Sequence, residues 1–230
     1  MLKNNLINVQ DKISKACERV GRSTDEVTLI AVSKTKPLSD IEELITYDMM
    51  QFGENKVQEL VDKFENVSTP VNWHLIGHLQ TNKVKYIVDK VQLIHSVDSL
   101  HLAKEKEKEA CKKNVVVNIL IQVNIAHEET KFGINENEIY ELLNEIKNFS
   151  HIKVCGLMTI APFVDNAEDN RVHFRNLYQL SLDIKSKNID NVTMNVLSMG
   201  MTNDYEIAIE EGATMVRVGT GIFGERNYNI

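Results

Sequence analysis

The chain of 230 residues has only three cysteines, three prolines and ten glycines, and each scarcity excludes a class of protein. Cys17, Cys111 and Cys155 are far apart and form no CxxC pattern, so neither a disulfide framework nor a metal site built on cysteine is expected. Such a pattern is typical of a reducing cytoplasm, which is the predicted location. Since no stretch is rich in proline, glycine or serine, we expect a single domain over residues 1–230.

Long hydrophobic runs and excess positive charge are also missing. No segment approaches the ~20 apolar residues that span a bilayer, and the N-terminus MLKNNLINVQDK lacks the apolar core of a secretory signal. The net charge of -7 opposes nonspecific attraction to nucleic acid or an anionic membrane, so neither is expected as a partner. Aromatic residues make up 6% of the chain, which offers no obvious interface patch and predicts a monomer.

What the sequence does contain is an alternation of short apolar runs with longer stretches of helical spacing. A first helix is expected over residues 2–20, with Gly21 as its stop. Ser39 is a plausible N-cap for the next helix, and further helices are expected over residues 57–64, 82–88, 100–112, 139–146, 171–187 and 204–210. The predicted strands are residues 27–33, 50–53, 72–76, 92–97, 115–124, 152–158, 193–197 and 214–219.

The predicted strands favour a parallel sheet covered on both faces. Runs such as VVVNILIQV are apolar without strict alternation, and the helices between them are long enough for right-handed crossovers. Eight strands is the number that a closed barrel requires. We therefore expect a single (β/α)8 TIM barrel with an extra N-terminal helix, although an open doubly wound sheet would read similarly and the strand count is the only local argument for closure.

In either architecture a ligand binds at the C-terminal ends of the strands. Lys34 follows the first strand, where period two places it on the same face as Ile30 and Val32. Burial there would lower the pKa of the amine and make it a nucleophile toward an aldehyde. The alternatives are a solvated surface lysine and a competing role for Lys36, just before Pro37.

The last two predicted strands end in glycine-rich segments, Ser198-Met199-Gly200 and Gly219-Thr220-Gly221. Barrels often bind phosphate in these two loops, so the pair is a candidate phosphate cradle, while each segment alone reads as turn chemistry. Arg217 points into the barrel if its neighbours point outward, and a buried guanidinium needs an acceptor. A ligand ring nitrogen, a phosphate or a carboxylate of the chain could serve.

Two further side chains at strand ends could hydrogen-bond a ligand, namely Asn55 in FGEN and His74 in WHLIGH. A histidine in such a place is more often satisfied by backbone or water. His74 and His78 share the spacing of two metal ligands on a helix, but they fall in a strand and the following turn, without the acid of an HExxH motif. No metal site is expected.

Motifs along nearly the whole chain resemble one family. They are AVSKTKP at 31–37, FGENKVQE at 52–59, WHLIGHLQTNK at 73–83, VNI at 123–125, KFGI at 131–134, GLMTI at 156–160, LSMGMTND at 197–204 and VRVGTGIFG at 216–224. Together, and in this order, they are similar to the pyridoxal phosphate homeostasis protein family (the YggS/PROSC group). A local departure is His78, where relatives often carry proline.

The resemblance implies a barrel similar to the N-terminal domain of alanine racemase, with pyridoxal 5'-phosphate (PLP) as the cofactor and an aldimine on Lys34. It places Arg217 opposite the pyridine nitrogen. It assigns the phosphate to Ser198, Gly200, Gly219 and Thr220, and matches cofactor-pocket positions less closely at Asn55, His74 and Met158. Lys131 matches a lysine near the pocket, without an assigned role.

The function implied is a PLP-binding protein that maintains vitamin B6 homeostasis without efficient catalysis, so no catalytic residue is assigned. A permanent cation beside the ring nitrogen weakens the cofactor as an electron sink, and after the last predicted strand we do not expect the second domain that completes alanine racemase. PLP, other B6 vitamers and apo PLP-dependent enzymes are the expected partners. The alternatives are an amino-acid racemase with Lys34 and His74 as bases, and a cofactor-free aldolase, which would need a carboxylate beside the lysine.

Overall fold

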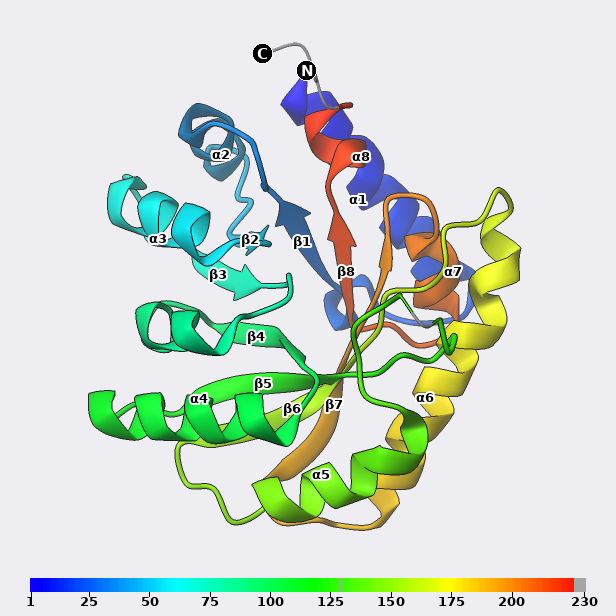
Figure 1. Ribbon diagram of the computed structural model, residues 1–230. Coiled ribbons are helices and arrows are strands. Elements are labelled where there is room, and N and C mark those ends of the chain that lie inside the picture. The colour runs from blue at the N-terminus through cyan, green and yellow to red at the C-terminus, as the bar shows by residue number, and fades with distance from the viewer. Residues whose placement is uncertain (129, 226–230) are drawn as a thin grey trace.

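Eight parallel strands close into a barrel in the computed structural model of the chain, which describes residues 1–128 and 130–225 (Figure 1). The strands are neighbours in chain order, and β8 pairs with β1 to complete the ring. The closed barrel confirms the predicted fold class over its open-sheet alternative. The strands are β1 (Thr28–Val32), β2 (Gln51–Glu54), β3 (Asn72–Leu75), β4 (Leu93–Val97), β5 (Val117–Gln122), β6 (Ile152–Met158), β7 (Val192–Met201) and β8 (Met215–Val218).

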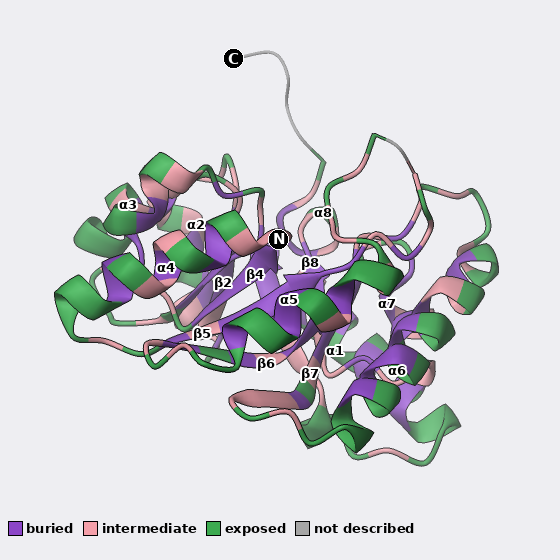
Figure 2. Cartoon of the chain, turned by 60° about the horizontal axis from the view of Figure 1, so that its bottom comes forward, coloured by how far each residue is buried: buried purple, intermediate pink, exposed green. Residues whose placement is uncertain are grey.

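Helices surround the barrel and bury one face each against it (Figure 2). The pattern follows from their sequences, in which apolar residues recur every three or four positions. Among the described residues, no helix is both apolar enough and long enough to cross a membrane. The helices are α1 (Leu2–Arg19), α2 (Leu38–Ile45), α3 (Val57–Asn66), α4 (Leu100–Lys113), α5 (Ile139–Ile146), α6 (Arg171–Ser186), α7 (Tyr205–Glu210) and α8 (Thr220–Phe223).

The extra N-terminal helix α1 packs on α7 and α8, beside the closing strand of the barrel (Figure 1). Its buried stripe follows helical spacing and consists of Leu2, Leu6, Val9, Ile13, Ala16 and Cys17. The helix ends as predicted, because Gly21 takes a φ of +67° and Arg22 N–H bonds back to Cys17 O at 3.0 Å. Arg19 also pairs with Glu206 and Glu210 of α7.

Two local predictions were wrong, and one short helix was missed. The segment after β3 is a 3₁₀ helix (Thr81–Tyr86) rather than an α-helix, and its buried Val84 is followed three residues later by buried Ile87, a spacing that suits three residues per turn. Helix α2 begins at Leu38 rather than after Ser39, because Pro37 fixes an extended entry and lacks the N–H that a helix start leaves unbonded. Helix α8 was not predicted.

Two lysines are buried among the described residues, Lys63 and Lys106, and Lys106 is the one without an ion pair or a hydrogen bond. Lys106 of α4 is fully buried, and its Nζ has no hydrogen-bond partner among the described residues. Burial lowers the pKa of Lys106 to about 7, and the charge of Asp98 opposes that shift only weakly. The folded state therefore favours a neutral amine where an unfolded chain would carry an ammonium with a pKa of ~10.4.

We predict that Lys106→Met stabilises the fold and that the gain depends on pH. Below the folded pKa of about 7 both states hold the proton and the burial cost is complete, on the order of 5 kcal/mol. Between that value and ~10.4 the unfolded state binds more protons, so wild-type stability rises with pH and the gain shrinks. Urea unfolding of wild type and variant at pH 6 and pH 9 measures the gain in free energy of unfolding. Lys108→Met, at an exposed position, is the control. A gain that is equal at both pH values would contradict the prediction.

Candidate functional site

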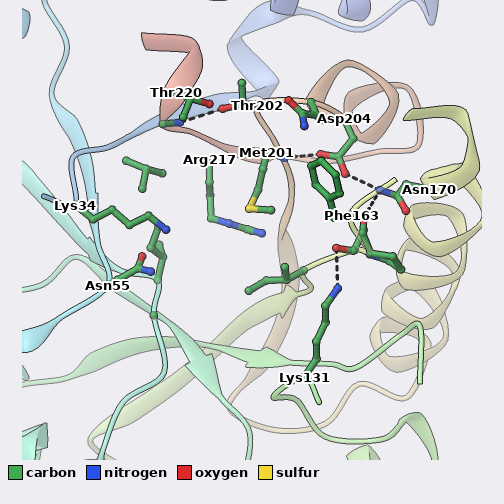
Figure 3. A pocket seen from close by; sticks show the side chains of 18 of the residues that line it. Lys34, Asn55, Lys131, Phe163, Asn170, Met201, Thr202, Asp204, Arg217 and Thr220 are labelled. Carbon is green, nitrogen blue, oxygen red and sulfur yellow. Dashed lines mark hydrogen bonds between the residues drawn. The ribbon is translucent and has the colours of Figure 1, made fainter. Parts of the chain in front are cut away.

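A pocket of about 930 Å³ opens at the C-terminal ends of the strands, where ligands bind in this fold (Figure 3). Four cationic side chains line it, and Asp204 is the one carboxylate among the described lining residues. Asp204 is already engaged, since it accepts hydrogen bonds from Met201 N at 2.7 Å and from Asn170 Nδ2 at 2.8 Å. The pocket is therefore positive in a chain of net charge -7, and it favours an anion; the cations are Lys34, Lys36, Lys131 and Arg217.

Lys34 lies two residues beyond β1, in a turn that hydrogen bonds hold on both sides. Ser33 O accepts from Lys63 Nζ at 2.8 Å, and Thr35 N–H donates to Glu59 Oε1 at 2.5 Å. Thr35 has a φ of 64°, a conformation that costs a β-branched residue energy and persists only where its surroundings impose it. The half-buried Lys34 side chain enters the pocket beside Asn55 and points toward Arg217 (Figure 3).

The anchors of this turn form a buried ionic cluster behind β1 and β2. Lys63 of α3 donates to Glu54 Oε1 and to Glu59 Oε1, both at 2.7 Å, and Ser33 Oγ donates to Glu54 Oε1 at 2.6 Å. Burial raises the pKa of Glu54, and Lys63 opposes the shift. Because these side chains bond to one another and to the backbone of the Lys34 turn, the cluster supports the turn rather than offering charge to the pocket.

Arg217 of β8 forms part of the pocket floor and is 3% exposed. It donates from Nη1 to Ser198 Oγ at 2.5 Å and from Nη2 to Thr159 O at 2.8 Å. Burial lowers the pKa of Arg217 to about 10, so the guanidinium is still charged at pH 7. Within the described residues it uses two of its five N–H donors and has no carboxylate in contact, which leaves donors for a pocket ligand.

The loops after β7 and β8 meet at the same end of the pocket. Thr202 Oγ1 accepts hydrogen bonds from Gly219 N at 3.3 Å and from Gly221 N at 3.4 Å, which are long for such bonds. Thr202, Gly219 and Thr220 line the pocket. Thr202 and Thr220 therefore line a common space, and the Gly219 and Gly221 N–H groups hold the Thr202 hydroxyl there, an arrangement suited to an anion such as a phosphate.

Comparison with known proteins identifies the family. The family described as "Alanine racemase, N-terminal domain" matches residues 5–227. The pyridoxal phosphate homeostasis protein of Aquifex aeolicus (strain VF5) is 46% identical over 97% of both chains, and that of Escherichia coli (strain K12) is 39% identical over 98% of this chain and 97% of its own. The chain belongs to the pyridoxal phosphate homeostasis protein family.

A solved structure of the same kind contains the cofactor. The structure of PipY of Synechococcus elongatus PCC7942 with PLP bound is 31% identical to this member of the family, with a TM-score of 0.82. The alignment covers 92% of this chain and all of PipY. The similarity therefore extends over most of the chain.

The structure brings together five of the nine residues that sequence analysis placed in the site. They line the pocket of this family member and are Lys34, Asn55, Arg217, Gly219 and Thr220. The other four lie outside the lining. Ser198 is buried beneath the floor against Arg217, Gly200 packs on α7, and His74 and Met158 are buried inside the barrel. The binding roles of all nine stay predictions.

Sequence analysis missed Thr202, His95 and the cluster behind the Lys34 turn. Thr202 follows Gly200 by two residues, so the alternation of side chains in LSMGMTND could have found it. His95 lies within an apolar run and Lys63 within a helix, and neither gives a local signal. The competing lysines also line the pocket: Lys36 Nζ donates to Phe223 O at 3.2 Å, and Lys131 Nζ to Ala161 O at 3.1 Å.

Gly200 meets a steric need that no other residue type satisfies. It has a φ of +88°, and a Cβ added there would lie 2.6 Å from Ala208 Cβ and 2.8 Å from Tyr205 Cα. Because Tyr205 Cα is backbone, the contact could be relieved only by moving α7 away from the end of β7. Gly200 therefore keeps the loop that carries Thr202 close to the barrel.

We predict that Gly200→Ala lowers the free energy of unfolding by about 3 kcal/mol, as backbone strain and overpacking add. Gly224→Ala is the matched control, because it has a φ of +76° and nothing within 4 Å of the added Cβ, so it carries the strain alone. Urea denaturation of both variants measures the difference. Equal losses would show that the contact with α7 is unimportant.

Proposed function

We propose that the chain binds PLP in this pocket, holds it as an aldimine on Lys34, and serves vitamin B6 homeostasis as a carrier without efficient catalysis. The observation that carries the proposal is the convergence of Lys34, Arg217 and the hydroxyl-lined loop on one positive pocket. The names of the curated relatives and the PLP bound in PipY support it. Other B6 vitamers and apo PLP-dependent enzymes are the proposed partners, and the cytoplasmic location and monomeric state stay predictions.

The side chains present fit the parts of this cofactor. Lys34 Nζ is the amine that would add to the aldehyde carbon, with C=N replacing C=O as water leaves. Thr202 and Thr220 would take the phosphate, with the Gly219 N–H holding the Thr202 hydroxyl in place. The free donors of Arg217 would face the ring nitrogen. When bound, the cofactor supplies an electrophilic carbonyl carbon that reacts reversibly with amines.

The pocket is better suited to holding PLP than to racemisation. Arg217 remains charged at pH 7 and opposes protonation of a ring nitrogen beside it, which limits carbanion stabilisation. His74, the candidate second base, does not line the pocket; its ring nitrogens are bonded to His95 and Gln51, and burial lowers its pKa to about 4. A neutral, enclosed imidazole cannot reach a substrate α-carbon in the pocket.

We predict that borohydride reduction of the PLP-loaded protein attaches the phosphopyridoxyl group to Lys34. Lys34→Ala should lose both the label and the visible absorbance while its unfolding curve stays close to wild type. Lys36→Ala is the matched control, since Lys36 also lines the pocket but donates to Phe223 O, and it should keep the label on Lys34. Peptide mass analysis reads both results, and a label recovered mainly on Lys36 or Lys131 would refute the assignment.

We predict that Thr220→Ala weakens PLP binding by roughly tenfold or more, because a hydrogen bond to a charged group contributes about 1.5–3 kcal/mol. Its affinity for pyridoxal, which lacks the phosphate, should not change. Ser198→Ala should weaken both ligands by the same factor, since Ser198 contacts Arg217 rather than the pocket. Equilibrium titrations of both ligands measure this, and a loss specific to PLP in Ser198→Ala would place Ser198 at the phosphate instead.

We predict that the amine of a free amino acid can replace the lysine amine on the bound PLP, and that the amino acid keeps its α-proton when this happens. Free alanine or serine should change the absorbance of the bound cofactor, since that step needs only the amine and the carbonyl carbon. Solvent deuterium should be incorporated at the α-carbon at rates well below ~1 s⁻¹, the lower end of typical enzyme turnover. Mass spectrometry of the recovered amino acids measures incorporation. Exchange at enzyme-like rates would favour the racemase alternative.

A further inference from the structure

A continuous line of buried polar side chains crosses the barrel interior and ends at Arg217. Arg217 Nη1 lies 2.5 Å from Ser198 Oγ, which lies 2.8 Å from His95 Nδ1. His95 Nε2 lies 3.0 Å from His74 Nδ1, and His74 Nε2 lies 2.9 Å from Gln51 Oε1. Gln51 starts β2, so the line runs from the N-terminal end of that strand to the pocket floor.

The donors along this line have one consistent order. A guanidinium can only donate and the Gln51 amide oxygen can only accept, which fixes both ends of the line. With neutral rings, Ser198 Oγ therefore accepts from Arg217 and its single hydrogen goes to His95 Nδ1. His95 then carries its proton on Nε2 and donates to His74 Nδ1, and His74 donates from Nε2 to the amide oxygen of Gln51. Every hydrogen in the line therefore points away from Arg217, and both imidazoles are neutral.

The surroundings favour that state. Both rings are buried, with exposures of 1% for His74 and 0% for His95. Burial lowers the pKa of both imidazoles. The nearby His74 and Arg217 lower the pKa of His95 further. The line is no proton relay, since it ends on an amide oxygen. Its effect is electrostatic: each dipole turns its negative end toward a buried cation that has no carboxylate in contact among the described residues.

We propose that His95, supported by His74, is a positioning residue that orients the Ser198 hydroxyl and thereby holds Arg217 in place at the floor of the PLP pocket. The inference rests on the proposed function for its effect on PLP, while the ordering of Arg217 is a property of the protein alone. Without His95, Ser198 Oγ–H is free to rotate, and its lone pairs need not face the guanidinium. Arg217 would then keep only its bond to Thr159 O.

The test on the apoprotein uses nitrogen NMR. Wild type should show both imidazoles as neutral Nε2–H tautomers, and the Arg217 N–H signals should be protected from solvent exchange. His95→Phe should abolish that protection, and His95→Asn should restore it, because the amide oxygen can accept from Ser198. Arg171, paired with Glu168, Glu210 and Glu211, is the internal control and should not change. Protected Arg217 signals in a folded His95→Phe variant would overturn the proposal.

The test on the loaded protein is a double-mutant cycle on the PLP dissociation constant. His95→Phe and Ser198→Ala should each raise it about tenfold, and the double variant should also raise it about tenfold, because His95 acts through Ser198. Multiplied effects of about a hundredfold, or no effect of His95→Phe, would overturn the proposal. Absence of PLP binding in wild type would defeat the proposed function alone, and the Arg217 signals would then decide the inference.

Discussion

A buried guanidinium that contacts no carboxylate of residues 1–128 and 130–225 is the constraint on which the architecture of the site depends. Arg217 is 3% exposed and charged at pH 7, so the barrel interior must compensate it with dipoles. That need explains why His74, His95 and Ser198 occupy interior positions that apolar side chains fill in most barrels of this class. It also explains why the donors left on the guanidinium are available to a ligand that enters from the strand ends.

Lys34 differs from the buried Arg217, because its side chain must be reachable from the pocket while its backbone is fixed. The two needs are met by different parts of the chain. The side chain lines the pocket, whereas the turn that carries it is tied to Lys63 and Glu59 on α3. The positive φ of Thr35 is tolerated because hydrogen bonds from the cluster behind the turn hold the backbone in that conformation. The lysine is thus presented to the pocket by a rigid turn.

Much of the fold could be predicted because it is encoded locally. Strand β6 and helix α5 match their predicted bounds, since both are apolar segments with clear ends. The helix after β3 was assigned the wrong type because spacings of three and of three to four residues overlap in a short segment. Barrel closure was supported only by the strand count, because an open parallel sheet has the same local pattern.

The site was less accessible to sequence analysis for a physical reason. Position at a strand end identifies which side chains can face the mouth, and this places Lys34, Arg217 and Thr220 correctly in the pocket lining. It does not distinguish a side chain that faces the ligand from one that faces another pocket residue. Ser198 is the second kind, since its partners come from β4 and β8, far away in the sequence. Such contacts exist only after the barrel closes.

The most direct test of the central role of Arg217 is the nitrogen NMR shift of PLP labelled at the ring nitrogen and bound to the protein. A charged guanidinium that donates to that nitrogen should keep it unprotonated, with a shift that stays constant between pH 6 and pH 9 and differs from the free pyridinium. Arg217→Glu should protonate it if the variant retains PLP. A ring nitrogen that is protonated in the wild-type protein at neutral pH would contradict the role assigned to Arg217.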